Sequence, residues 1–221
     1  MDVTNLILEV TRRCDMTCDH CLRGDMQKKD IKHTTIDNLL IGNEIDYISS
    51  VTFTGGEPSL NTNAIRYFLD TCENNSIGIG GFYIATNGKT ENEEFLKVLM
   101  DLYLYCDDNE CTQVQVSRDD YHYDQNEEWI NKLKILRFVN EKQNLEYRHV
   151  IAEGKGAWNS DGRKIKIYER HIVADDGRIE NDELYINVNG DILTSCDLSY
   201  TRQNREKIGN INNDKLIELT E

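Results

Sequence analysis

The sequence predicts an α/β fold in which short β-strands alternate with longer α-helices. Apolar, strand-like runs recur along most of the chain, and the segments between them repeat apolar residues with the 3.6-residue period of a helix. These segments are long enough for the return path that parallel neighbouring strands require. With 221 residues, of which 38% are hydrophobic, the chain can bury a core. We therefore expect one mostly parallel sheet with right-handed crossovers.

The strands are expected where short apolar runs end in turn-forming residues. The first run, Leu6–Val10, precedes a cysteine-rich loop, and the third ends at the turn signal Asn87-Gly88. The expected strands cover residues 6–10, 48–54, 81–86, 112–117, 147–152 and 184–188.

The helices between these strands are expected from their apolar faces. The faces consist of Ile36, Leu39 and Leu40, of Ile65, Phe68, Leu69 and Cys72, of Phe95, Val98, Leu99 and Leu102, and of Trp129, Leu133 and Leu136. Parallel sheets of this kind bind ligands at the carboxyl ends of their strands, where the loops diverge. A functional site is therefore expected at that edge.

The domain organisation changes near residue 155. Residues 1–155 are expected to form the strand–helix core, and residues 156–221 the last strand of the sheet and a hairpin and helix extension, because the strand–helix rhythm falters over 155–182. Residues 185–196 are typical of a β-hairpin with Asn189-Gly190-Asp191 at its tip.

Composition excludes several classes of function. The formal charge is −15, which disfavours extended binding to a nucleic-acid backbone or to an anionic membrane surface. No apolar run approaches the roughly 20 residues of a spanning helix, and the start of the chain lacks the pattern of a signal peptide. Seven cysteines, an odd number, are unlike a secreted disulfide framework. We expect a cytoplasmic protein whose reduced thiols can hold a metal.

Three cysteines, Cys14, Cys18 and Cys21, lie within eight residues just beyond the first strand. A loop this short can wrap three thiolates around one iron–sulfur cubane and leave the fourth iron without a nearby protein ligand. Structural zinc is the alternative, and it would need a fourth ligand such as His20 or Cys196.

A glycine turn, Gly55-Gly56-Glu57-Pro58, follows the second strand. Paired glycines let a ligand approach the backbone closely, and the Glu57 carboxylate suits an ammonium group. Taken alone, the turn also fits an ordinary entry into a helix.

Together and in this order, the two motifs resemble those of the radical S-adenosylmethionine (radical SAM) superfamily over about residues 5–153. The resemblance implies a partial barrel of six strand–helix units, (β/α)6, with a short C-terminal extension. It implies that Cys14, Cys18 and Cys21 bind a 4Fe-4S cluster whose open iron is chelated by SAM. In the family an electron, here expected from a flavodoxin- or ferredoxin-type donor, cleaves SAM to a 5'-deoxyadenosyl radical that abstracts hydrogen from the substrate.

The resemblance also assigns candidate residues around SAM. These are His20, Gly55, Gly56, Glu57, Asn87, Ser117 and Ile151. Each also has a simpler interpretation: His20 could only shield the cluster, Asn87 could belong to a turn, Ser117 could precede a helix cap, and Ile151 could be core. Arg12 and Arg13 could favour the reduced cluster, pair with the SAM carboxylate, or lie on the surface.

The substrate is less well defined. The hairpin of residues 185–196 is similar to the start of the SPASM or twitch extension of peptide-modifying radical SAM enzymes, but no cysteine follows Cys196, so a full auxiliary cluster is not expected. The leading hypothesis is an enzyme acting on a peptide or protein. A nucleotide or small-molecule substrate and a non-enzymatic metal-binding protein are the alternatives. The basic residues Lys155, Arg163, Lys164, Lys166 and Arg170 indicate either a solvated face or a contact with an anionic substrate.

Overall fold

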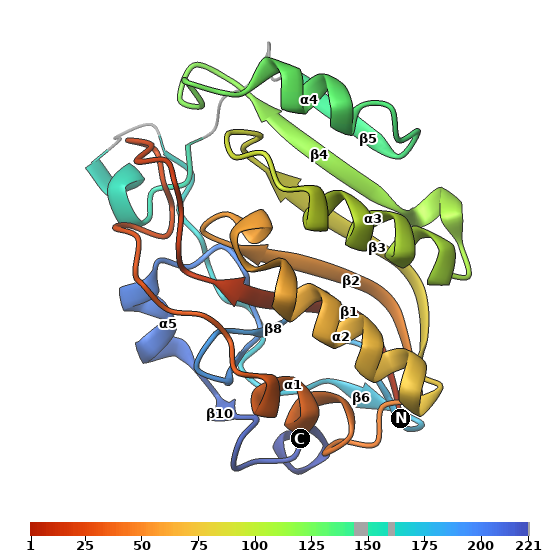
Figure 1. Cartoon of the computed structure of the whole chain (residues 1–221). Coiled ribbons are helices and arrows are strands. Elements are labelled where there is room, and N and C mark those ends of the chain that lie inside the picture. Colours follow the sequence, from red (N-terminus) through yellow and green to blue (C-terminus); the bar gives the residue numbers. More distant parts are fainter. Residues whose placement is uncertain (144–149, 159–161, 221) are drawn as a thin grey trace.

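The computed structural model describes residues 1–143, 150–158 and 162–220, which build a single twisted sheet covered by helices (Figure 1). The strands follow the order β10-β9-β8-β1-β2-β3-β4-β5, and a small β6–β7 pair joins the sheet through β1. The strands are β1 (Asp2–Thr11), β2 (Tyr47–Gly55), β3 (Gly78–Thr86), β4 (Gln113–Arg118), β5 (Val139–Gln143), β6 (Ala174–Asp175), β7 (Arg178–Ile179), β8 (Leu184–Ile186), β9 (Asp191–Leu193) and β10 (Gly209–Asn210).

The centre of this sheet is parallel, which confirms the predicted α/β class. Strands β1 to β5 pair in chain order, and β7 and β8 both pair in parallel with β1. The strand β8 therefore lies beside the first strand, at the opposite side of the sheet from β5, and the sheet stays open.

The helices α1 to α4 all cover one face of the sheet (Figure 1). The helices are α1 (His33–Leu40), α2 (Thr62–Asn75), α3 (Glu93–Tyr105), α4 (Glu127–Leu133) and α5 (Tyr200–Glu206), with short 3-10 turns η1 (Pro58–Asn61), η2 (Asn109–Cys111), η3 (Gly154–Trp158) and η4 (Leu216–Leu219). The predicted apolar faces are buried in one core, except that Leu136 lies beyond α4 and is half-buried. Asn92 and Asn126 cap α3 and α4 by accepting hydrogen bonds from backbone N–H groups of the first turn.

The prediction of the fifth strand is wrong in position. The strand after α4 is β5, Val139–Gln143, which pairs with β4. Of the expected range 147–152, residues 147–149 lie outside the described residues, and Ile151 forms only an isolated bridge with Arg163. β5 is an edge strand with one apolar residue in five, so it lacks the apolar alternation on which the prediction relied.

The C-terminal hairpin is confirmed. β8 and β9 pair antiparallel around the loop Asn187–Gly190, where Gly190 has a φ of +81°, a conformation that favours glycine. β10 then pairs antiparallel with β9. The extension thus continues the same sheet beyond β1, and the boundary near residue 155 stays a prediction.

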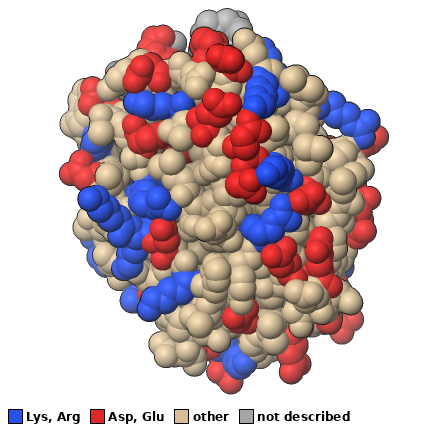
Figure 2. Space-filling view, viewed as in Figure 1, with Lys and Arg blue, Asp and Glu red and all other residues tan. Residues whose placement is uncertain are grey.

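Charged side chains are mixed over the surface. Figure 2 shows Asp and Glu interspersed with Lys and Arg on the face that carries α1 to α4, without a continuous basic stripe across that face. Among the described residues, none of the helices has both the length and the apolar composition that a bilayer crossing needs.

Candidate active site

All ten residues singled out in the sequence line one cavity of about 440 Å³ at the carboxyl end of the sheet. They are the three cysteines Cys14, Cys18 and Cys21, together with His20, Gly55, Gly56, Glu57, Asn87, Ser117 and Ile151. They come together because β1 to β4 run in the same direction, so the loops that follow these strands meet at one edge. A larger, more open hollow of about 890 Å³ near Met1 and Lys215 contains none of them.

The cysteine loop, residues 14–21, presents three free thiols to this cavity. The segments on either side of this loop are joined by a hydrogen bond from Arg12 N to the Lys29 carbonyl (2.8 Å), and the loop itself accepts one at the Cys21 carbonyl from Lys155 N (2.9 Å). Burial raises the pKa of the Cys14 thiol to about 12. The pKa of the Cys18 thiol is also raised, first by burial and second by the negative charge of the nearby Cys21 thiolate. The metal-free thiols of Cys14 and Cys18 are therefore protonated at neutral pH, and metal binding must displace these protons.

Among the described residues, the three thiols do not form a ready-made tetrahedral zinc site. In tetrahedral zinc the Zn–S bonds are about 2.3 Å, so bound sulfurs lie roughly 3.8 Å apart. The three cysteine sulfurs are not among the groups of described residues whose ligand atoms all lie within 4.8 Å of one another. Thiolates are the usual ligands of iron–sulfur clusters, and three of them suit a cubane with one open iron.

A second, smaller hollow of about 160 Å³ is also lined by the three cysteines. Its wall also includes the cationic side chains of Arg12, Arg23 and Lys155. Positive charge next to three thiolates stabilises the negative charge that they and a bound cluster carry.

The glycine pair lets the cysteine loop lie against the end of β2. A Cβ on Gly55 would stand 2.1 Å from the Thr11 carbonyl oxygen, and a Cβ on Gly56 would stand 2.3 Å from that of Arg13. Gly56 N donates to the Thr11 carbonyl (2.9 Å), and Glu57 N donates to the Arg13 carbonyl (2.8 Å). The glycines are therefore required by the approach of the loop backbone, whatever they do for a ligand.

Gly56→Ala should consequently displace the loop. The backbone must move to admit the new methyl group, so we expect a loss of roughly 1–3 kcal/mol in the free energy of unfolding, measured by urea denaturation. We also expect a lower iron content after anaerobic reconstitution. Ser50→Ala, at a half-buried position of the preceding strand β2, is the matched control. Unchanged stability and unchanged iron in Gly56→Ala would contradict this role.

Glu57 is buried and joins the ends of β2 and β3. Its Oε1 accepts from Ser59 N (3.1 Å) and Thr86 Oγ1 (2.8 Å), and its Oε2 accepts from Asn87 N (2.8 Å). Burial raises the pKa of this carboxyl, and the hydrogen bonds from Asn87, Ser59 and Thr86 oppose the rise. An ionised carboxylate can accept about four hydrogen bonds, so Oε2 has room for one more donor.

Asn87 contacts the cysteine loop directly. Its Nδ2 donates to Asp15 Oδ1 (2.8 Å) and lies 3.9 Å from Cys14 Sγ, while its Oδ1 accepts from Lys89 N (2.9 Å). These contacts brace the loop around Cys14. The contact with SAM expected for Asn87 stays a prediction, as does that of Ser117, whose side chain lies on the cavity wall.

His20 lies beside two aromatic residues from the loop after β4. Its ring centroid is 4.2 Å from that of Tyr121 and 5.3 Å from that of His122. His122 also lines the cavity, and its Nδ1 is 2.8 Å from Asp119 Oδ1. The sequence places Tyr121-His122-Tyr123 after the fourth strand, where these residues could face the substrate, but does not fix their position. The aspartate three residues before His122, directly after a strand, is the signal that could have identified this site residue.

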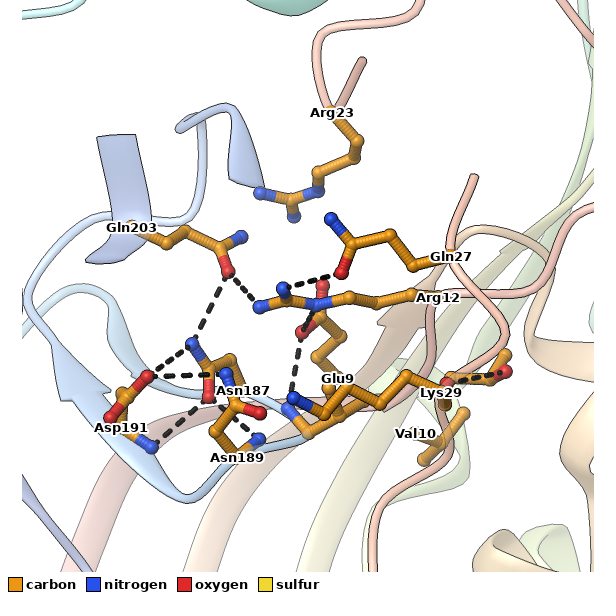
Figure 3. Close-up of polar contacts among 12 residues, drawn as sticks. Glu9, Val10, Arg12, Arg23, Gln27, Lys29, Asn187, Asn189, Asp191 and Gln203 are labelled. Carbon is orange, nitrogen blue, oxygen red and sulfur yellow. Dashed lines mark hydrogen bonds and ion pairs between the residues drawn. The ribbon is translucent and has the colours of Figure 1, made fainter. Parts of the chain in front are cut away.

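Arg12 is buried, which rules out the surface position, one of the three alternatives given for it. Its Nε is 3.0 Å from Glu9 Oε2, and its Nη2 donates to Gln203 Oε1 on α5 (2.7 Å). Figure 3 shows Arg12 between Glu9 and Gln203, with Asn187 and Asp191 of the hairpin continuing the chain of contacts. This network fastens the C-terminal extension to the residue that precedes the cysteine loop.

Arg23 fastens the other end of the same loop. It donates to the Leu198 carbonyl (2.8 Å) and to the Cys196 carbonyl (2.5 Å), and its guanidinium lies 5.1 Å from the centre of the Tyr185 ring. Cys196 itself lines the 440 Å³ cavity, and burial raises the pKa of its thiol. The extension therefore contributes directly to the wall of the site.

Two curated proteins are similar to parts of this chain. The "Uncharacterized protein MJ0907" of Methanocaldococcus jannaschii is 34% identical over 105 residues, which are 44% of this chain and 35% of that protein. The "Putative protein YfkA" of Bacillus subtilis is 37% identical over 71 residues, which are 31% of this chain and 19% of that protein. The matched segments thus span about a third or less of these relatives.

Solved structures share the fold across nearly the whole chain. Native anSMEcpe with bound AdoMet and Cp18Cys peptide has a TM-score of 0.57 at 12% identity, covering 99% of this chain and 80% of that one. BtrN in an open conformation has a TM-score of 0.53 at 15% identity, covering 97% and 78%. Streptococcus suis SuiB bound to precursor peptide SuiA has a TM-score of 0.52 at 14% identity, covering 97% and 63%.

The family comparison concerns the region that builds the site. The family model "Radical SAM superfamily" matches residues 8–150, well over half of the chain, from β1 through the cysteine loop and the glycine turn to Val150 on the cavity wall. This protein therefore belongs to the radical SAM superfamily.

Proposed function

We propose that this protein is an enzyme that cleaves SAM reductively at a 4Fe-4S cluster held by Cys14, Cys18 and Cys21, and that its substrate is a peptide or protein. The observation that carries the proposal is the single cavity shared by the cysteine loop, the glycine turn and the later strand ends. When bound, the cluster and SAM supply a 5'-deoxyadenosyl radical that abstracts hydrogen from the substrate. An electron donor of the flavodoxin or ferredoxin type completes the proposal.

The residues of the chain orient these groups. Glu57 is proposed to accept a hydrogen bond from the SAM ammonium at Oε2, beside backbone groups of Gly55 and Gly56; its position on the cavity wall supports this role. Asn87 holds the loop at Cys14 through Asp15. His20 and Ile151 are proposed to flank the adenine, and Ser117 to meet the ribose, because all three lie on the same cavity wall.

A peptide substrate is favoured over a nucleotide or another small molecule. Two of the structures with this fold hold peptides, namely the Cp18Cys peptide in anSMEcpe and SuiA in SuiB. The chain also carries a hairpin and helix whose residues Cys196 and Asp197 complete the cavity. We propose that this extension faces the substrate, with Cys196 on the cavity wall.

The direct test is the formation of 5'-deoxyadenosine from SAM by the anaerobically reconstituted, chemically reduced protein, measured by mass spectrometry. Formation of 5'-deoxyadenosine supports the proposed enzyme. A reconstituted protein that binds iron but leaves SAM intact would instead indicate a metal-binding protein. Acceleration by peptides, compared with acceleration by nucleotides, then separates the two substrate classes.

Glu57→Gln tests the proposed contact with the ammonium group. The change removes the negative charge but keeps the size of the side chain, so the cluster should still assemble. Hydrogen bonds to charged groups contribute about 1.5–3 kcal/mol, so the dissociation constant for SAM should rise by roughly 10- to 100-fold. Equilibrium dialysis with labelled SAM measures it, and iron analysis checks the cluster. Unchanged affinity at equal iron content would remove Glu57 from the SAM site.

A further inference from the structure

The segment Lys164–Tyr168 has the alternation of an extended strand. Ile165 and Ile167 are half-buried against a small core of Tyr185, Leu193 and Leu198. Lys164, Lys166 and Tyr168 alternate with them and are exposed. A period of two is the pattern of a β-strand with one face on the core.

This segment has no strand partner among the described residues. It belongs to none of the pairs in the sheet, and no backbone N–H from Lys164 to Tyr168 donates to a described group. Of the carbonyls in this stretch, only that of Ile165 accepts a hydrogen bond there, from Arg202 Nη1 (3.0 Å). A row of unpaired backbone groups is a template for a further strand.

A groove of about 390 Å³ runs along the segment and leads to the active site. Residues 163–169 form one wall, and Asp182, Glu183, Thr194, Ser195 and Asp197 complete the lining. Asp197 lines both this groove and the 440 Å³ cavity, and its Oδ2 is 3.0 Å from an Arg163 nitrogen. A chain lying in the groove would pass this ion pair and reach the cavity beside Cys196.

We propose that residues 164–168 dock the substrate as an added β-strand, and that the docked peptide segment is acidic at alternate positions. This inference rests on the proposed function, since it requires a peptide substrate. Lys164 and Lys166 project from the same face, and neither has an ion-pair partner among the described residues. Side chains directly opposite on neighbouring strands lie about 4.5–5.5 Å apart, so carboxylates spaced two residues apart would face both lysines.

The wall of the groove opposite residues 163–169 determines which side chains the peptide can carry at the positions that face into the groove. Asp182, Glu183 and Asp197 make that wall acidic, and the Glu183 carboxylate accepts a hydrogen bond from Cys196 N (2.7 Å). Side chains of the peptide that point into the groove should therefore carry no negative charge. The preferred segment alternates acidic residues on the outer face with uncharged residues on the inner face.

The test uses the anaerobically reconstituted full chain and three fluorescein-labelled octapeptides, with fluorescence anisotropy as the readout. The first peptide alternates Glu with Thr, the second alternates Lys with Thr, and the third is the first with alternate amides N-methylated. We expect the Glu peptide to bind at least about tenfold more tightly than the Lys peptide, and N-methylation to abolish binding because it removes the donors of the added strand. Equal binding of the Glu and Lys peptides, or indifference to N-methylation, would overturn the proposal.

A charge-reversed variant and a matched control locate the site. The double variant Lys164→Glu, Lys166→Glu should invert the preference, so that the Lys peptide binds better than the Glu peptide. The variant Lys28→Glu, Lys29→Glu changes two exposed lysines beyond the cysteine loop and should leave both affinities unchanged. If the Lys28→Glu, Lys29→Glu variant lost the preference for the Glu peptide while the Lys164→Glu, Lys166→Glu variant kept it, the peptide would bind at another surface, and the proposal would be overturned.

The same samples separate this inference from the proposed function. SAM cleavage with no binding of the Glu peptide defeats the groove proposal and leaves the enzyme assignment intact. Binding of the Glu peptide with no SAM cleavage defeats the enzyme assignment and leaves the groove in place.

Discussion

Replacing Cys18 with alanine is expected to abolish the iron–sulfur cluster and, with it, the cleavage of SAM. The three cysteines occupy one short loop, and Cys18 is the most buried of the three residues, with 9% of its surface exposed. Two remaining thiolates cannot hold a cubane that needs three protein ligands. Iron should fall from about four atoms per chain to near zero, and the visible absorption of the cluster should disappear. Iron analysis and absorption spectroscopy of the reconstituted variant measure both.

The other cysteines provide the control for this experiment. Cys111 is exposed in η2, away from the cavity, so Cys111→Ala should keep the full iron content. Cys72 is buried in the core, where burial raises the pKa of its thiol to about 12, and Cys72→Ala should cost stability without loss of iron. A Cys18→Ala protein with the same iron as Cys111→Ala would refute the ligand set.

Arg12→Met is expected to cost roughly 3–5 kcal/mol in the free energy of unfolding, a large share of the total stability of a typical domain. Arg12 is 2% exposed and Glu9 is fully buried, so the variant would leave the Glu9 carboxylate without its ion-pair partner. Gln203 would also lose its contact with Arg12, which loosens the junction between the extension and the cysteine loop. Urea denaturation of the metal-free protein measures the change without interference from iron.

Arg13→Met is the matched control, because Arg13 pairs with Asp30 while both side chains are more than a third exposed. Exposed pairs contribute about 0–1 kcal/mol, so this neighbour should change stability little. The double variant Glu9→Met, Arg12→Met removes both buried charges and should recover part of the loss. Equal losses for Arg12→Met and Arg13→Met would show that the buried pair has no special role.

The features that were predicted correctly from the sequence are those that depend on the local spacing of apolar residues. The helix faces around Phe68 and Leu99 repeat with a clear period, and their residues are buried as expected. The meeting of the ten candidate residues in one cavity follows from parallel strands, since loops at the same edge must converge. The strand β5 was missed in its true position because an edge strand does not need an apolar pattern.

Contacts between distant parts of the chain could not be predicted. Glu9 and Gln203 lie far apart in the sequence, and only the folded sheet places β1 next to the hairpin that carries Asn187. The reason for Gly55 and Gly56 was likewise incomplete, because the backbone that they admit belongs to the end of β1 and to the residue before the cysteine loop. In each case tertiary packing determines which residue is contacted, and the spacing of residue types along the sequence does not reveal it.

The proposed reaction requires an iron that the protein leaves open for SAM. Electron paramagnetic resonance of the reduced, reconstituted protein, recorded before and after addition of SAM under strictly anaerobic conditions, tests this directly. We predict the signal of a reduced 4Fe-4S cluster that changes when SAM is added, because SAM occupies the iron without a cysteine. A protein that holds zinc instead, or a cluster signal that is identical with and without SAM, would contradict the account.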